Sequence, residues 1–361
     1  ATPEIYHPSL PAALPIWATP PNRNHPAMST CAPTPPTAAN ATPPLLDVRG
    51  LYKTYALPRG QKLKAVDGIS LSVTSGEVLG LVGESGCGKS TLGRCLLRLT
   101  DVSAGQILFN GQDITKLPER ALRPLRPHMQ MVFQDSYASL NPRRRIADLL
   151  AEPLRVHPTA TGQKRSSSAI TARLHELMER VSLPLSALER YPHEFSGGQR
   201  QRINIARAMA LSPKLIVADE PVSALDVSVQ AQIINLFADL QAQLGLTYVF
   251  VAHDLAVIRQ ISTRVAVMYL GAIMELGQTD TVLHNPAHPY TLALTQAVPQ
   301  PVIGAIRPPP LRGDIPSPVS RPAGCRFHTR CPIAQPLCRE EEPALRQIST
   351  QRAVACHFPL A

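Results

Sequence analysis

A glycine-rich turn that follows an apolar run carries the clearest chemical signal in the sequence. The turn fits the pattern G-x-x-x-x-G-K-[ST] with Gly83, Glu84, Ser85, Gly86, Cys87, Gly88, Lys89 and Ser90. Its glycines let successive backbone N–H groups curl around phosphate oxygens, and the positive end of the following helix strengthens the attraction. In this arrangement Lys89 reaches the terminal phosphates, the Ser90 hydroxyl ligates Mg²⁺ and Thr91 adds a phosphate contact. The turn therefore predicts a site for nucleotide phosphates and Mg²⁺, in which Cys87 fills a variable position and only packs.

Two consecutive acids end an apolar run further along the chain. Residues 215–218 are Leu, Ile, Val and Ala, and Asp219 and Glu220 follow them directly. Two carboxylates at the end of a buried strand are costly unless a cation lies nearby. Mg²⁺ supplies that cation for Asp219, which leaves Glu220 to polarise a water for attack on the γ-phosphate. A pair of surface acids after a core strand is the alternative, and the phosphate-binding turn disfavours it.

A third segment combines a helix cap with two glycines, and its members are Ser196, Gly197, Gly198 and Gln199. The spacing of Ser196 and Gln199 predicts a capping box, in which each side chain bonds the backbone N–H of the other residue. Glycine weakens a helix, so an ordinary helix cap would not explain why both Gly197 and Gly198 stand in the first turn. The glycines bare the amides of the helix N-terminus, which predicts a second anion site.

Strand-like and helical runs alternate around these segments. The strand-like runs span residues 45–55, 69–73, 78–82, 129–133, 215–218 and 248–251, and helical spacing covers 146–183 and 227–244. Strands that alternate with helices predict an α/β fold with a mostly parallel sheet covered on both faces. The helical run at 146–183 interrupts the alternation and indicates an inserted helical subdomain.

Composition limits the class of protein. The chain has 361 residues and a formal net charge of +10. No apolar stretch approaches the roughly 18–20 residues that a membrane-spanning helix needs. Aromatic residues make up only 4% of the chain, which disfavours a base-stacking surface for nucleic acid. Residues 1–44 hold twelve prolines without periodicity, so we expect this segment to be disordered, with Met28 as a candidate initiating residue.

With these features in place, the chain resembles the ATP-binding cassette of ABC transporters. Residues 196–199 are similar to the ABC signature, although Phe195 stands where leucine is commoner. The other matches are Gln134 with the Q-loop glutamine, Ser223, Ala224, Leu225 and Asp226 with the D-loop, His253 with the switch histidine, and Tyr55 with the A-loop aromatic residue. The resemblance implies a P-loop NTPase fold, with a RecA-like core, an antiparallel β-subdomain and a helical subdomain at about 140–211.

The resemblance also implies roles for these residues. ATP is expected to bind residues 83–91 with its adenine stacked on Tyr55. Mg²⁺ is expected at Ser90, Gln134 and Asp219, and hydrolysis is expected to rest on Glu220, His253 and Gln134. The active unit of this family is a head-to-tail dimer, so the signature of one subunit closes over ATP held by the P-loop of the other.

Within ABC proteins, the chain is similar to the ATP-binding subunits of dipeptide and oligopeptide importers. The segments that carry this likeness are 130–135, 137–142, 191–193 and 288–291, with Ser136 where proline is usual. The likeness implies a nucleotide-binding domain at 45–298 and an oligopeptide-transporter-type C-terminal module at 299–361. Its implied partners are a second ABC ATPase, paralogous or identical, two transmembrane permease subunits and, indirectly, an extracytoplasmic peptide-binding protein. It implies a peripheral place on the cytoplasmic face of the inner membrane, and nickel chelates and glutathione remain alternative cargoes.

Four cysteines lie close together near the C-terminus: Cys325, Cys331, Cys338 and Cys356. A cytosolic location disfavours disulfides, and the gaps between these cysteines are wider than the C-x₂₋₄-C pairs of most zinc sites. Four thiolates on a loop-rich module can hold a [4Fe–4S] cluster, and related peptide-importer ATPases carry one there. The alternatives are zinc, with His328 and His357 as further ligands, and thiols without metal.

Two rival functions fit the sequence less well. ABC ATPases that act on nucleic acid or ribosomes generally carry two cassettes or long coiled-coil insertions, and this chain has one P-loop and neither insertion. We therefore expect no nucleic-acid partner. A regulatory module that binds ATP without hydrolysing it conflicts with the presence of both Glu220 and His253.

Overall fold

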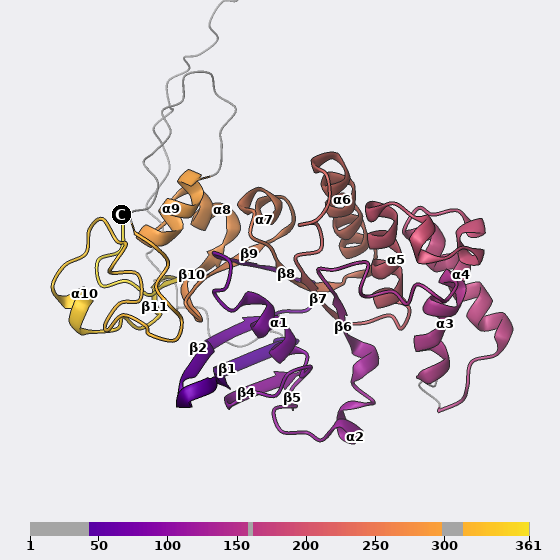
Figure 1. Ribbon diagram of the computed structural model, residues 1–361, viewed down its shortest axis with the longest axis horizontal. Coiled ribbons are helices and arrows are strands. Elements are labelled where there is room, and N and C mark those ends of the chain that lie inside the picture. Colours follow the sequence, from indigo (N-terminus) through magenta and orange to yellow (C-terminus); the bar gives the residue numbers. More distant parts are fainter. Residues whose placement is uncertain (1–42, 158–161, 298–312, 361) are drawn as a thin grey trace, which may run out of the picture. The chain divides into compact units, whose positions relative to one another are not determined.

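The computed structural model describes residues 43–157, 162–297 and 313–360, whose arrangement is shown in Figure 1. The expectations for the N-terminal segment and Met28 lie outside these residues, except at positions 43 and 44. The expected boundary between residues 298 and 299 also lies outside them. Among the described helices, none is both long enough and apolar enough to cross a bilayer.

Four strands from the first part of the chain form a small antiparallel sheet. They are β1 (Leu46–Ala56), β2 (Lys62–Val73), β4 (Ala104–Phe109) and β5 (Gln112–Asp113), in the order β2-β1-β4-β5. The second half of β2 buries Ile69, Leu71 and Val73 and leaves the residues between them more exposed, because side chains alternate across a strand. The expected antiparallel β-subdomain is confirmed.

The second sheet is mostly parallel and carries the P-loop strand at its centre. Its order is β11-β12-β10-β9-β3-β8-β7-β6. The strands are β3 (Val78–Val82), β6 (Met129–Val132), β7 (Leu215–Asp219), β8 (Thr247–Val251), β9 (Arg264–Tyr269), β10 (Ala272–Gln278), β11 (Arg346–Ser349) and β12 (Arg352–Val354). Every residue of β3, β7 and β8 is buried, as continuous apolar runs covered on both faces require.

Helices follow the strands and cover this sheet. The described helices are α1 (Lys89–Leu96), α2 (Glu119–Leu122), α3 (Ile146–Val156), α4 (Ser167–Arg180), α5 (Gly197–Met209), α6 (Val227–Leu244), α7 (Leu255–Ile261), α8 (Thr279–His284), α9 (Pro289–Ala297) and α10 (Leu337–Glu340). Short 3₁₀ turns occupy Pro58–Gly60, Arg126–His128, Leu185–Glu189 and Pro192–Glu194. Helices α3, α4 and α5 lie between β6 and β7 in the chain and form the inserted helical subdomain, whose limits of about 140 and 211 stay a prediction.

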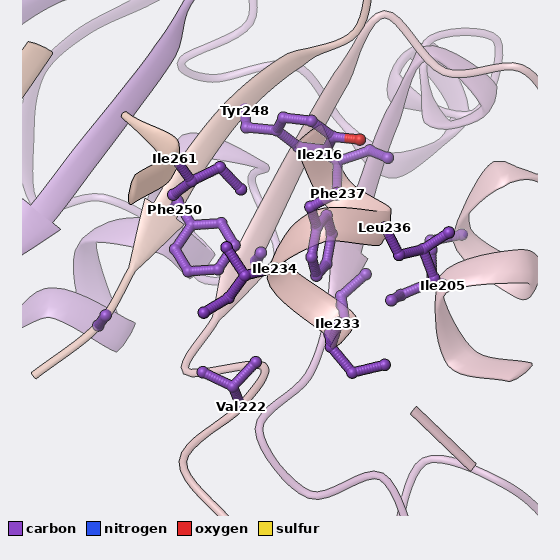
Figure 2. Close-up of a cluster of buried hydrophobic side chains, with 14 of the residues drawn as sticks. Ile205, Ile216, Val222, Ile233, Ile234, Leu236, Phe237, Tyr248, Phe250 and Ile261 are labelled. Carbon is purple, nitrogen blue, oxygen red and sulfur yellow. The ribbon is translucent and has the colours of Figure 1, made fainter. Parts of the chain in front are cut away.

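Strand β8, which leads to His253, packs against helix α6 in the core. Figure 2 shows Phe237 of α6 beside Tyr248 and Phe250 of β8. Both aromatic pairs meet edge to face, with ring centroids 5.4 Å apart. Such pairs add to the free energy gained by burying the rings, so the end of β8 is firmly fixed.

The C-terminal residues extend the same sheet. Strand β12 pairs antiparallel with β10, and β11 pairs with β12. Phe327 is fully buried, and its ring lies 5.5 Å from that of Tyr269 on β9 and 5.3 Å from that of Tyr290 on α9. This region therefore shares its core with the nucleotide-binding part of the chain.

Candidate functional site

The P-loop follows the carboxyl end of β3 and contains two glycines, Gly83 and Gly88, at positions with no room for a side chain. Gly83 and Gly88 have positive φ angles of 152° and 104°. A Cβ atom at Gly83 would collide with the carbonyl oxygen of Met268, and one at Gly88 with that of Ala65. The loop thus depends on glycine for both its backbone conformation and its close approach to neighbouring strands.

Lys89 is the first residue of α1 and points back across the loop. Its Nζ donates to the carbonyl oxygens of Gly83 at 2.8 Å and Glu84 at 3.1 Å. Ser85 and Gly86 are exposed at the tip, and Thr91 is half-buried in the first turn of the helix. Cys87 is buried, and burial raises the pKa of its thiol, which agrees with a packing role. The ammonium group is therefore held where nucleotide phosphates would meet it.

Asp219 ends β7 beside the start of α1. It is 2% exposed, and the Ser90 hydroxyl donates a 2.7 Å hydrogen bond to its Oδ1. Burial raises the pKa of this carboxyl, while the bond from Ser90 opposes the rise. In the described part of the chain, no group of three His, Cys, Asp or Glu side chains suits a metal ion by itself. Protein Mg²⁺ sites usually combine one or two carboxylates with substrate phosphates, so Ser90 and Asp219 could hold the ion. The expectation that Gln134 is a further Mg²⁺ ligand stays a prediction, because its side-chain amide bonds Glu220 here.

Glu220 contacts Gln134 and His253, the other two residues expected to act in hydrolysis. Its carboxylate Oε2 accepts a 3.0 Å hydrogen bond from Gln134 Nε2 and lies 3.5 Å from His253 Nδ1. The three residues follow β7, β6 and β8, which are neighbours in the sheet, so their carboxyl ends meet at one edge. Glu220 has φ of 44°, a strained conformation that sequence reasoning did not predict. Such strain concentrates at functional sites, and here it turns the carboxylate toward its two partners.

The loop after Gln134 is held at both ends. The carboxylate of Asp135 accepts hydrogen bonds from the backbone N–H groups of Tyr137 at 2.8 Å and Ala138 at 3.0 Å. Asn204 of α5 donates to the carbonyl oxygen of Ser136 at 3.2 Å. These bonds fix the backbone around Ser136.

The signature segment forms the predicted capping box at the start of α5. Ser196 Oγ accepts from the N–H of Gln199 at 3.4 Å, and Gln199 Oε1 accepts from the N–H of Ser196 at 3.0 Å. Ser196, Gly197 and Gln199 are exposed. A Cβ atom at Gly198 would collide with Val229 of α6. Close packing of α5 on α6 is thus a second reason for glycine, which the sequence pattern did not reveal.

The D-loop and the A-loop residue occupy exposed turns and strand ends. Ser223 Oγ donates to the carbonyl oxygen of Glu220 at 3.1 Å, which ties the D-loop to the strand end that carries Glu220. Ala224 and Asp226 are exposed, and Leu225 is half-buried. Tyr55 lies near the end of β1 with 36% of its surface exposed, and Lys53 Nζ is 4.8 Å from the centre of its ring. A half-exposed ring is free to stack on a further group.

The four C-terminal cysteines line one small pocket. Cys325, Cys331, Cys338 and Cys356 share it with His288, His328 and His357, among others. Burial raises the pKa of the Cys325 thiol to about 11 and also raises those of Cys331 and Cys356. His288, which sequence analysis did not assign to this group, is almost fully buried, and its Nδ1 accepts from the N–H of Tyr290 at 3.0 Å. The four cysteines lie 37 to 68 positions after His288 in the chain, so no local sequence pattern could place them together.

Comparison with known proteins gives likenesses along most of the chain. A family profile described as ABC transporter matches residues 66–223, and one described as oligopeptide/dipeptide transporter, C-terminal region, matches 274–338. The oligopeptide transport ATP-binding protein AppF of Bacillus subtilis is 50% identical over 332 residues, which cover 89% of this chain and 99% of that protein. The oligopeptide transport ATP-binding protein OppF of Salmonella typhimurium is 51% identical over 324 residues, which cover 86% of this chain and 95% of that protein.

Solved structures resemble the nucleotide-binding part. One is a dimeric post-hydrolysis structure of the ATP-binding cassette MJ0796 bound to ADP and Pi, with a TM-score of 0.59 and 27% sequence identity. The match covers 65% of this chain and 98% of that chain. The structure of cbiO1 from Clostridium perfringens also has a TM-score of 0.59, with 26% identity, and covers 67% of this chain and 91% of that chain.

The contact between Gly198 and Val229 yields a stability prediction. Gly198→Ala is expected to destabilise the protein by about 1–3 kcal/mol, because the added methyl group overpacks the α5–α6 contact. Gly198→Ala/Val229→Ala should regain most of this loss, since alanine also favours the helix by about 1 kcal/mol over glycine. Urea unfolding of both variants and of the Val229→Ala control measures the effect. A double variant as unstable as Gly198→Ala would contradict the steric explanation.

Proposed function

The chain belongs to the family of ABC transporter ATP-binding proteins, and we propose that it binds and hydrolyses ATP to energise an importer of dipeptides or oligopeptides. The observation that carries this proposal is the meeting of Glu220, Gln134 and His253 beside the P-loop strand. The sequence identity of 50–51% with the oligopeptide transport proteins AppF and OppF supports peptides as the cargo. No observation favours nickel chelates or glutathione over peptides.

The chemistry follows from the geometry of the site. Mg²⁺ bound at Ser90 and Asp219 would neutralise phosphate charge. Lys89 would exchange its bonds to the loop carbonyls for bonds to the terminal phosphates. Glu220, held by Gln134, is positioned to accept a hydrogen bond from the attacking water, and His253 can contact the γ-phosphate from the next strand. Residues 83–91 would cradle the phosphates, and Tyr55 would stack on adenine.

We also propose that the signature acts on ATP held by a second subunit. The exposed cap at Ser196, Gly197 and Gln199 leaves amides of α5 free to face a phosphate. In the described residues, no hydrogen bond joins residues 196–199 to the P-loop of the same chain. A partner subunit, paralogous or identical, would complete both sites, with residues 223–226 at the contact.

A groove beside the Q-loop suits a permease partner. It has a volume of about 360 Å³, and its lining includes Phe133 after β6, Val156 of α3 and Arg207 of α5. Phe133 and Val156 are 42% and 51% exposed and both line this groove, and apolar surface gathered in a groove is typical of a protein contact. We propose that a cytoplasmic segment of one permease subunit docks here and places the protein at the cytoplasmic face of the inner membrane.

The cysteine pocket is the proposed site of a [4Fe–4S] cluster. Support comes from Cys325, Cys331, Cys338 and Cys356, which line one small pocket, although in the described residues no group of three metal-binding side chains is already spaced to hold an ion. Four thiolates are the usual ligands of such a cluster, and none of the nucleotide chemistry needs an electron. The cluster would therefore cross-link the loops of this region.

The first prediction of this proposal concerns Glu220. Glu220→Gln should bind Mg-ATP with nearly normal affinity, but hydrolysis in the assembled transporter should fall by at least roughly a hundredfold, because the water loses its general base. ATP titration and phosphate release measure the two effects. Glu179→Gln, an exposed substitution on α4, is the matched control. Near-normal turnover by Glu220→Gln would remove this residue from the mechanism.

The second prediction tests the action of the signature on the partner. Ser196→Arg, introduced together with Glu220→Gln, should leave ATP binding by the single subunit intact and prevent the ATP-dependent dimer, because a bulky side chain fills the anion site. Gel filtration with ATP detects the dimer, and Ser168→Arg at the exposed start of α4 is the control. Equal loss of ATP binding by the monomer would mean that the segment shapes its own subunit's pocket.

The third prediction concerns metal content. Anaerobically purified protein should be brown and contain about four iron atoms per chain, the stoichiometry of one cluster. Cys331→Ser should lose iron and colour, while Cys95→Ser, in α1 and outside the cysteine pocket, should keep both. Stoichiometric zinc, or no metal when the cluster-assembly machinery is supplied, would eliminate the cluster.

A further inference from the structure

The P-loop is contacted by a charged side chain from the far C-terminal region. Arg330 forms a two-pronged ion pair with Glu84, with Nη1 2.7 Å from Oε2 and Nη2 3.0 Å from Oε1. Glu84 is the second residue of the P-loop, and Arg330 directly precedes Cys331. The pair therefore joins the nucleotide loop to the segment that carries the cysteines.

A second contact reaches the same P-loop residue. The backbone N–H of Glu84 donates to the hydroxyl of Tyr290 at 2.9 Å. Burial strongly raises the pKa of this phenol, so the hydroxyl stays neutral. The N–H and the carboxylate of Glu84 are thus both held by residues outside the P-loop.

The segment that carries Arg330 is itself firmly anchored. Arg326 donates to the carbonyl oxygen of Leu270 and to the carboxylate of Asp67, both at 2.7 Å. Phe327 fills the aromatic cluster beside Tyr290. Arg330 is consequently presented to the P-loop by a rigid support rather than by a free surface loop.

Stability alone does not account for this ion pair. The Arg330 side chain is only 6% exposed, and its Nε has no hydrogen-bond partner among the described residues. Desolvation of a guanidinium group often cancels the attraction to its carboxylate, so buried ion pairs contribute little net stability. Removal of one partner is different, because it leaves the other charge uncompensated. Without Arg330, the carboxylate of Glu84 would stand unpaired in the loop that must receive phosphates.

We propose that Arg330 is a positioning residue of the nucleotide site, which neutralises Glu84 and holds the P-loop in the conformation that accepts phosphates. In this proposal Arg330 acts through its contact with Glu84. This inference rests on ATP binding by the P-loop, the first part of the proposed function. It makes the C-terminal region a part of the ATP site of its own subunit.

The test uses the full-length chain and measures its affinity for Mg-ATP together with its unfolding midpoint in the absence of nucleotide. Arg330→Met should raise the Kd for ATP by roughly tenfold or more, the effect of one uncompensated charge near phosphates. Arg330→Lys, which keeps the charge but not the two-pronged geometry, should fall between Arg330→Met and the native chain. Arg339→Met, an exposed substitution in the same region, should bind as the native chain does.

A double-variant cycle shows whether Arg330 acts through Glu84. Glu84→Gln/Arg330→Met should bind ATP no more weakly than Arg330→Met alone, because the unpaired carboxylate is gone. Additive losses, or a lowered unfolding midpoint with an unchanged Kd, would overturn the proposal. If Arg330→Met does not fold, Tyr290→Phe tests the same anchor and should weaken ATP binding several-fold, roughly the effect of one hydrogen bond. Failure of ATP binding by the native chain would instead refute the proposed function.

Discussion

A buried carboxylate at the end of β7 sets the geometry of the whole site. Asp219 is 2% exposed, and the Ser90 hydroxyl satisfies one of its oxygens at 2.7 Å. This bond joins α1 to β7 across 129 positions of the sequence and fixes the P-loop against the acidic strand end. A buried carboxylate is costly unless a cation lies nearby, which supports the proposed Mg²⁺ site at Asp219. Glu220 follows directly, and its left-handed backbone turns the next carboxylate toward Gln134 and His253.

The sequence predicted those parts of the site whose chemistry lies in consecutive residues. The P-loop, the acidic strand end and the capping box of Ser196 and Gln199 each fit within a short segment, where spacing alone determines which groups meet. The parallel sheet was also predictable, because fully buried strands read as continuous apolar runs. The likeness to ABC cassettes then supplied Gln134 and His253, which no local pattern identifies as partners of one carboxylate.

The remaining contacts depend on packing between distant segments. Tyr290 and Arg330 reach Glu84 across 206 and 246 positions of the sequence. The sequence around each residue does not predict its contact with Glu84. An arginine next to a cysteine, for example, is equally consistent with a side chain exposed to solvent. The need for glycine at position 198 has the same origin, because it is Val229 of another helix that leaves no room. Side-chain contacts of this kind emerge only when the sheet and its helices are assembled.

Helix α5 connects two functional segments that the sequence presents separately. Ser196 caps its N-terminus, and further along it Asn204 and Arg207 donate to carbonyl oxygens of the loop that follows Gln134. At about 1.5 Å per residue, these contacts lie roughly 12–16 Å from the cap along one stiff helix. Asn204 and Arg207 also line the groove beside β6. The proposed partner in the groove and the proposed phosphate at the cap would therefore contact the same helix, whose bonds to the loop after Gln134 lead to Glu220.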